Sequence, residues 1–258
     1  MIVEWYIYLI AIVGGAVAGS INTLAGNGSA ITLTILTEVL GLPGNLANGT
    51  NRVGVLTQAT AGTWAFHKYG KLDLNRGRLN VVLTCLGAML GVIVAVQVSN
   101  EQFMFVFRYL MLAMLIVLLV KPARWLKETD TSKEVSHWIA VPMYLALGFY
   151  GGFIQMGMGI FYLAAMVLVA RYSIVEGNAL KSFVVAVYTI FVLIIFQIKG
   201  LVAWDIGAIL AVGQTAGGWY TAKFASQSKR ANMVAYWLLV VIVVIASLRL
   251  FGLIGFGF

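Results

Sequence analysis

The chain alternates apolar stretches of helical length with short polar turns that are rich in glycine and basic residues. A helix that spans a bilayer needs about 20 mainly apolar residues, and several stretches reach that length. The pattern therefore predicts an all-α fold, a polytopic helical membrane protein. The expected helices cover residues 5–19, 29–40, 46–66, 79–98, 103–120, 138–151, 160–170, 175–198, 204–224 and 233–251.

Two of the expected helices are too short to cross a bilayer. Residues 29–40 and 160–170 cover at most about 18 Å at 1.5 Å per residue, against a hydrocarbon core of about 30 Å. Each follows a break in the apolar pattern, Gly26-Asn27-Gly28 in the first case and Gly157-Met158-Gly159 in the second. We expect each short helix to form a hairpin with the helix before it. Whether these hairpins span the membrane or re-enter it stays open.

The two halves of the chain carry the same pattern. The second break lies 131 residues after the first (157 − 26 = 131), and the segment 196–200 repeats the segment 66–70. Each half holds about five helices, so the second half enters the membrane from the opposite side. Secondary transporters are built from such inverted repeats, with their sites between the repeats near the midplane. We expect repeats at residues 1–120 and 137–258, joined by a cytoplasmic linker at 121–136.

Composition supports a membrane protein, because 61% of the residues are hydrophobic, 10% are charged and the mean hydropathy is +0.95. Soluble domains carry about 25% charged residues. The net charge is +8, and the positive residues cluster in turns, so they indicate topology and no nucleic-acid partner is expected. The turns after the third, fifth, seventh and ninth helices hold most basic residues, and the opposite turns hold only Lys199. By the positive-inside rule, both termini are extracytoplasmic in the inner (cytoplasmic) membrane.

Catalytic and metal chemistry lack the residues that they need. Cys85 is the single cysteine and lies in an apolar stretch, so thiols cannot build a metal cluster. We find no nucleophile with a base at membrane depth, so no enzyme, no cofactor and no metal site is expected. All acidic residues fall at helix ends or in turns. A cation pathway usually needs carboxylates within the membrane, so their absence there argues against a cation as substrate.

Two basic residues do enter the membrane. Arg52 and Lys181 each lie about six residues inside an expected helix, hence roughly 9 Å deep. They occupy nearly matching places in the two halves, which suggests one positive site shared between the repeats. Each has polar neighbours: Thr50 and Asn51 precede Arg52, and Ser182 follows Lys181. The alternative is that both long side chains snorkel to the interface.

The breaks supply the other candidate ligands. At the first break, Asn27 and Gly28 would place backbone N–H groups and a positive helix end beside an anion. The alternative is that the small residues only allow close helix packing. Met158 could face an apolar part of the ligand or simply pack in the core. The expected substrate-binding set is Asn22, Asn27, Gly28, Thr50, Asn51, Arg52, Gln155, Gly157, Met158, Lys181 and Ser182.

The duplicated pattern AGNGSAITLTILTEVLGLPGNLANGTNR and GGFIQMGMGIFYLAAMVLVARYSIVEGNALKS resembles the TauE/SafE family of sulfite exporters and sulfonate permeases. The resemblance covers nearly the whole chain, although the family's frequent glycine run with a Val-Pro pair is absent at the first break. It implies a secondary transporter of sulfite, a sulfonate or a sulfoacetate-like anion. The alternatives are a passive anion channel and a transporter of another small organic anion. Expected partners are the small anion, the lipid bilayer and a coupling ion, with a homodimer as an open alternative.

Overall fold

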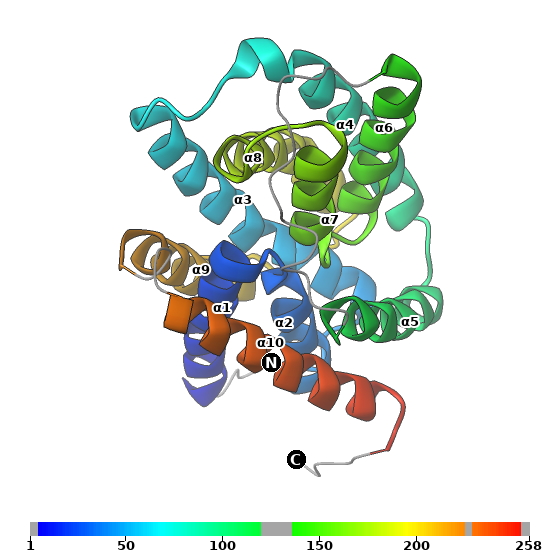
Figure 1. The fold of residues 1–258 in the computed structure, drawn as a ribbon. Helices are drawn as coiled ribbons and strands as arrows, with labels where there is room; N and C mark the ends of the chain where they lie inside the picture. The colour runs from blue at the N-terminus through cyan, green and yellow to red at the C-terminus, as the bar shows by residue number, and fades with distance from the viewer. Residues whose placement is uncertain (1–4, 120–135, 225–228, 254–258) are drawn as a thin grey trace.

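The computed structural model describes residues 5–119, 136–224 and 229–253, and these residues contain helices and no strands. The prediction of an all-α fold is confirmed (Figure 1). The expected linker lies almost entirely outside the described residues. The elements are α1 (Trp5–Ala25), α2 (Gly28–Thr34), the π-helical turn η1 (Ile35–Val39), α3 (Gly44–Lys68), α4 (Leu74–Ala95), α5 (Asn100–Leu119), α6 (His137–Phe153), α7 (Met158–Ala164), the π-helical turn η3 (Ala165–Val169), α8 (Ile174–Ile198), α9 (Trp204–Phe224) and α10 (Lys229–Leu250).

The element bounds repeat along the chain with a constant offset. α2 and α7 each have seven residues and begin 130 residues apart (158 − 28 = 130), and α3 and α8 each have 25 residues with the same offset (174 − 44 = 130). The turns η1 and η3 also match. The structure therefore repeats one order of elements in both halves.

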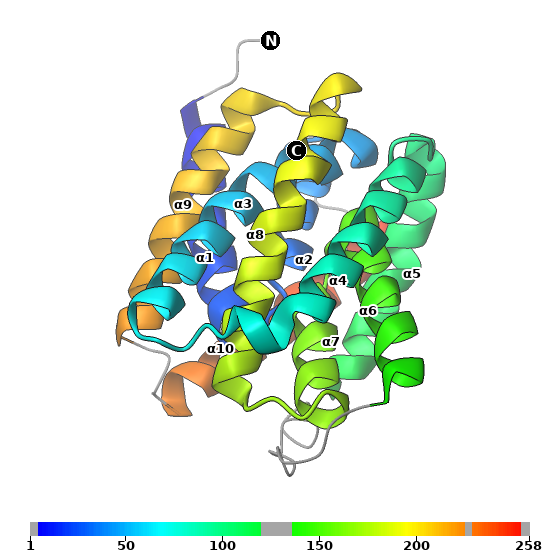
Figure 2. The same ribbon diagram turned by 90° about the horizontal axis from the view of Figure 1, so that it is seen from above.

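The central helices of the two halves pack side by side in opposite directions. Near the start of α3, the Thr50 hydroxyl accepts a hydrogen bond of 3.0 Å from the Ala203 N–H, just beyond the end of α8. Near the end of α3, a Cβ on Gly62 would lie 3.3 Å from the Ser182 hydroxyl, near the start of α8. Figure 2 shows the turn after α3 and the turn after α8 at opposite ends of the molecule. This is the direction change that an inverted repeat requires.

The fourth helix of each half packs against the first helix of the other half. α1 lies along α9, and α4 lies along α6. Glycines make these crossings close: a Cβ on Gly19 would overlap the backbone of Gln214, and a Cβ on Gly91 would overlap the backbone of Phe149. Small residues at such crossings let membrane helices gain packing contacts.

The helices thus form two bundles, and each bundle includes the fourth helix of the other half of the chain. We call α1, α2, α3 and α9 the first bundle, and α4, α6, α7 and α8 the second bundle. Figure 1 shows α4, α6, α7 and α8 gathered above α1, α2 and α9, and α3 runs upward beside α8. The α5 and α10 helices pack on each other, and α10 also contacts α2. The α3 and α8 helices form the main contact between the bundles. Any motion of one bundle against the other would therefore have to occur across this α3 and α8 contact.

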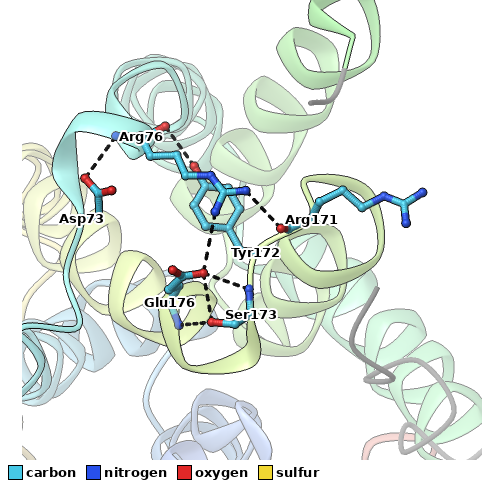
Figure 3. Close-up of polar contacts among 6 residues, drawn as sticks. All are labelled: Asp73, Arg76, Arg171, Tyr172, Ser173 and Glu176. Atoms are coloured by element: carbon cyan, nitrogen blue, oxygen red, sulfur yellow. Dashed lines mark hydrogen bonds and ion pairs between the residues drawn. The ribbon is translucent and has the colours of Figure 1, made fainter. Parts of the chain in front are cut away.

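One polar cluster fixes α4 within the second bundle (Figure 3). The Arg76 guanidinium stacks 4.2 Å from the Tyr172 ring centre, donates a bond of 3.1 Å to the Arg171 carbonyl and lies 3.8 Å from the Glu176 carboxylate. Tyr172 returns a hydrogen bond of 2.9 Å to the Arg76 carbonyl. Asp73 caps the start of α4, because its side-chain oxygen accepts hydrogen bonds from the N–H groups of the second and third residues of the helix. The α4 helix therefore begins earlier in the chain than its apolar pattern predicts.

The two ends of the molecule differ in charge among the described residues. The turns 69–73 and 170–173 meet at one end, which we call the Arg76 face, and the turns 40–43, 96–99 and 199–203 meet at the other, the Thr50 face. The Arg76 face has a clear excess of positive charge. Basic residues at this face include Lys68, Lys71, Arg76, Arg78 and Arg171.

Among the described residues, two helices, Leu74–Ala95 and Ile174–Ile198, are long and apolar enough to cross a membrane by length and composition. The segments Gly28–Val39 and Met158–Val169 are shorter apolar helices, as the sequence predicts. At the Thr50 face, Arg249 forms an ion pair of 3.2 Å with Glu38 at the end of the first short helix.

Candidate functional site

The two helix breaks touch each other in the interior. Gly26 has a positive φ of 73°, and a Cβ on it would lie 3.0 Å from the Gly159 carbonyl carbon. Conversely, a Cβ on Gly159 would lie 2.5 Å from the Gly26 carbonyl oxygen. Only glycine lets the two backbones approach this closely. The breaks of the two bundles therefore form one central region, and the sequence predicts the substrate-binding site in this region.

Asn27 lies in this place with its side chain fully buried. Its Oδ1 is 3.6 Å from the position that a Cβ on Gly157 would take, so it faces the second break. Neither its side-chain nitrogen nor its oxygen has a hydrogen-bond partner among the described residues. A buried polar group without a partner costs about 1–3 kcal/mol. Asn27 is therefore the predicted site residue whose environment most favours a ligand role.

The start of α2 is more enclosed than the sequence suggests. The Gly28 N–H donates to the Asn22 side-chain oxygen over 3.2 Å, and the Asn22 nitrogen donates to Gln58 over 3.1 Å. One of the N–H groups expected to face an anion is thus bonded within the protein. A Cβ on Gly28 would overlap the Ala18 carbonyl, so close packing also explains this glycine.

Polar residues of α3 tie this helix to its neighbours. The Thr32 hydroxyl of α2 donates to the Asn51 oxygen over 2.5 Å, while the Asn51 nitrogen has no partner among the described residues. Thr50 is fully buried, and its hydroxyl is engaged by the Ala203 N–H. Asn51 thus keeps a free buried donor beside α2, whereas Thr50 holds the turn before α9.

Arg52 is fully buried, so it does not snorkel to the interface. Its Nη1 donates to the Gly151 carbonyl over 2.6 Å, and its Nη2 donates to the Gly152 carbonyl over 3.0 Å. Both carbonyls belong to the last turn of α6, where four carbonyls lack partners within the helix. The positive side chain thus caps the negative end of a broken helix.

The second break is held by side chains from both bundles. Gln155 has a positive φ of 66°, unusual for a residue other than glycine. Its side-chain oxygen accepts hydrogen bonds from Arg52 over 2.9 Å and from the Tyr188 hydroxyl over 2.6 Å. Asn48 donates to the Phe153 carbonyl over 2.7 Å and accepts from Arg52 over 3.3 Å. This network fixes the unwound backbone between α6 and α7.

Sequence reasoning did not assign Tyr188 a role. It lies in an apolar stretch of α8, 130 positions after Gln58 (188 − 58 = 130), which holds the first break through Asn22. The repeat offset is the signal that could have found it.

Lys181 lies away from the breaks. Its ammonium group donates to Asn178 on the same helix over 2.8 Å, and the Ser182 hydroxyl donates to the Asn178 carbonyl over 3.0 Å. Arg52 lies 5.8 Å from the ring centre of Phe196, which follows Lys181 by 15 positions of α8, or about 22 Å of helix. The structure therefore does not bring Arg52 and Lys181 together as one shared positive site.

The methionines of the second break are packed in the core. Met156 and Met158 are both fully buried, in different hydrophobic clusters. A Cβ on Gly157 would lie 2.6 Å from the Met114 sulfur, and this glycine has a φ of 70°. The packing explanation for Met158 thus has direct support, and a contact with ligand stays a prediction.

The fold and these broken helices define a polytopic helical membrane protein of the transporter class. The family model described as sulfite exporter TauE/SafE matches residues 11–250, and the chain belongs to this family. Its members are membrane transporters and not enzymes.

Curated relatives are similar over most of their length. A probable membrane transporter protein of Sinorhizobium sp, ORF9, is 23% identical over 91% of this chain and 88% of its own. The probable membrane transporter protein YfcA of Escherichia coli K12 is 26% identical over 78% of this chain and 74% of its own. The probable membrane transporter protein YunE of Bacillus subtilis is 22% identical over 86% and 89%. No solved structure matches the chain.

Proposed function

We propose that this membrane transporter moves a small sulfur-containing anion, such as sulfite, a sulfonate or a sulfoacetate-like compound, across the cytoplasmic membrane by alternating access. The observation that carries the proposal is the fully buried Asn27 amide, which faces the opposite break and has no partner among the described residues. The amide offers one donor group and one acceptor to a ligand at the point where the two repeats meet.

Charge favours an anion in this position. Arg52 brings a full positive charge to the second break, and the described ion pairs, Arg76 with Glu176 and Arg249 with Glu38, leave it without a carboxylate partner. The Asn51 nitrogen is a further buried donor near α2. In the apolar interior such groups attract an anion strongly because water does not screen them. The choice of a sulfur oxyanion rests on the family name.

The remaining predicted site residues keep secondary roles in this proposal. Asn22, Gly28, Thr50, Gln155 and Gly157 shape the two breaks, whereas Met158, Lys181 and Ser182 would contact the anion only in another conformation. We propose the repeats at 1–120 and 137–258, with the linker 121–136 in the cytoplasm and both termini outside. A coupling ion and a homodimer stay hypotheses.

Uptake into proteoliposomes tests the proposal. Radiolabelled sulfite or a small sulfonate should enter with saturation, and an unlabelled anion on the opposite side should accelerate its exchange. A passive anion channel would give flux without saturation and without counter-exchange. Competition by acetate or phosphate that exceeds competition by any sulfur oxyanion would favour a transporter of another organic anion and overturn the substrate assignment.

A further inference from the structure

We infer that Arg52 is a positioning residue that clasps the two bundles together on the Thr50 side of the breaks, so that this face opens only when the clasp is released. The inference rests on the alternating-access part of the proposed function. It concerns which contact must break and not which anion is carried.

The clasp joins α3 of the first bundle to α6 of the second bundle. Arg52 donates three hydrogen bonds to the α6 end and its break, to Gly151, Gly152 and Gln155. Asn48 adds a fourth, to the Phe153 carbonyl. Counting the bond to Asn48, four of the five guanidinium N–H groups are engaged, and only Nε lacks a partner among the described residues.

The position of the clasp assigns it to one face. The Arg52 guanidinium lies over the Phe196 ring, two residues before α8 ends at the Thr50 face. On the other side of the breaks, α3 and α8 meet at Gly62 and Ser182, where the Ser182 hydroxyl is bonded within its own helix. The contact between α3 and α8 thus includes polar and charged groups towards the Thr50 face, whereas small residues pack together towards the Arg76 face.

The second arginine cluster provides the contrast. Arg76 contacts Arg171, Tyr172 and Glu176, which all belong to the second bundle with α4 (Figure 3). Its bonds would move with that bundle as a unit. Each arginine donates a hydrogen bond to a residue other than glycine that has a positive φ, Arg52 to Gln155 and Arg76 to Arg171. Residues strained in this way cluster at places of functional constraint. Of these two arginines, Arg52 is the one whose hydrogen bonds join the two bundles.

Two cysteine reporters in a Cys85→Ala background measure each face separately. Leu193→Cys places a thiol on α8 among Val53 and Ala211 of the first bundle, towards the Thr50 face, and Ser182→Cys places one opposite Gly62 towards the Arg76 face. The rate of reaction with a polar maleimide is followed on purified protein in nanodiscs without any substrate. A failure of the proposed substrate therefore cannot affect the result.

Arg52→Gln should raise the labelling rate at Leu193→Cys at least about tenfold and leave the rate at Ser182→Cys unchanged or lower. Arg52→Lys should restore part of the protection, because an ammonium group can still donate to the α6 carbonyls. Arg76→Gln, the matched control, should change neither rate. A rise at both reporters would indicate general loosening, and no rise at Leu193→Cys would show that the clasp does not hold this face; either result overturns the inference.

A second variant covers the case in which Arg52→Gln does not fold. Asn48→Ala removes one bond across the bundles and one support of Arg52, and should raise labelling at Leu193→Cys about threefold with no change at Ser182→Cys. Unchanged labelling at Leu193→Cys in this variant would contradict the clasp.

Discussion

Nη1 of Arg52 donates a hydrogen bond of 2.6 Å to the carbonyl oxygen of Gly151, 99 positions away in the chain and in the other bundle. A guanidinium in hydrocarbon needs partners for its donors, and the end of a broken helix offers unpaired carbonyls and a negative dipole end. The carbonyls at the end of α6 satisfy the guanidinium donors, and the guanidinium satisfies these carbonyls, so both can lie within the membrane. The broken helix and the buried arginine are thus parts of one arrangement.

Arg52→Gln should lower the free energy of unfolding by about 3 kcal/mol, because it removes one partner of a buried charged network and leaves α6 carbonyls unpaired. Thermal unfolding in detergent without ligand measures the change. Arg108→Gln is the control, since Arg108 is exposed on α5 and should change stability by less than about 0.5 kcal/mol. Equal stability of the two variants would show that the bonds of Arg52 contribute nothing net.

Gly159→Ala should abolish transport, because the added methyl group would lie 2.5 Å from the Gly26 carbonyl oxygen and force the breaks apart. Gly62→Ala is the control, because its methyl group would meet only the Ser182 side chain, with the hydroxyl oxygen at 3.3 Å and the Cβ at 3.6 Å. Uptake assays with equal amounts of inserted protein separate the two variants. Wild-type transport by Gly159→Ala would show that the contact between the breaks is not needed.

The orientation can be tested by cysteine labelling in intact cells in a Cys85→Ala background. Gln102→Cys, near the Thr50 face, should react with an impermeant thiol reagent from outside. Lys71→Cys, in the turn of the Arg76 face, should react only after the membrane is opened. External labelling of Lys71→Cys would reverse the proposed topology.

Much of the fold could be predicted from the sequence because the hydrophobic pattern determines where membrane helices form. The expected α9 matches the observed bounds, and α8 differs by one residue. The π-helical turns at the ends of α2 and α7 could not be predicted. They depend on wide turns closed by backbone bonds, such as Leu40 N–H to the Ile35 carbonyl, and not on a side-chain pattern.

The site was less predictable, because its partners are backbone groups of distant segments. Sequence position alone identified Arg52 and the two breaks as candidates. It could not show that Arg52 would bind the end of α6, since carbonyl groups carry no sequence signal. Lys181 nearly matches Arg52 in the repeat, yet the opposite directions of α3 and α8 place the two charges at different levels. Matching positions in inverted repeats are related by symmetry and need not meet.

Binding of an anion between the breaks at Asn27 can be tested by comparing ligand binding and stability in Asn27→Leu and in the wild type. Leucine has a similar shape and removes a buried amide without partners among the described residues, so unliganded Asn27→Leu should be at least as stable as wild type, by up to about 1 kcal/mol. Its affinity for sulfite or a small sulfonate, measured by calorimetry, should fall at least about 30-fold, equivalent to about 2 kcal/mol. Wild-type affinity in Asn27→Leu, or a loss of unliganded stability as large as that expected for Arg52→Gln, would show that Asn27 does not bind the anion.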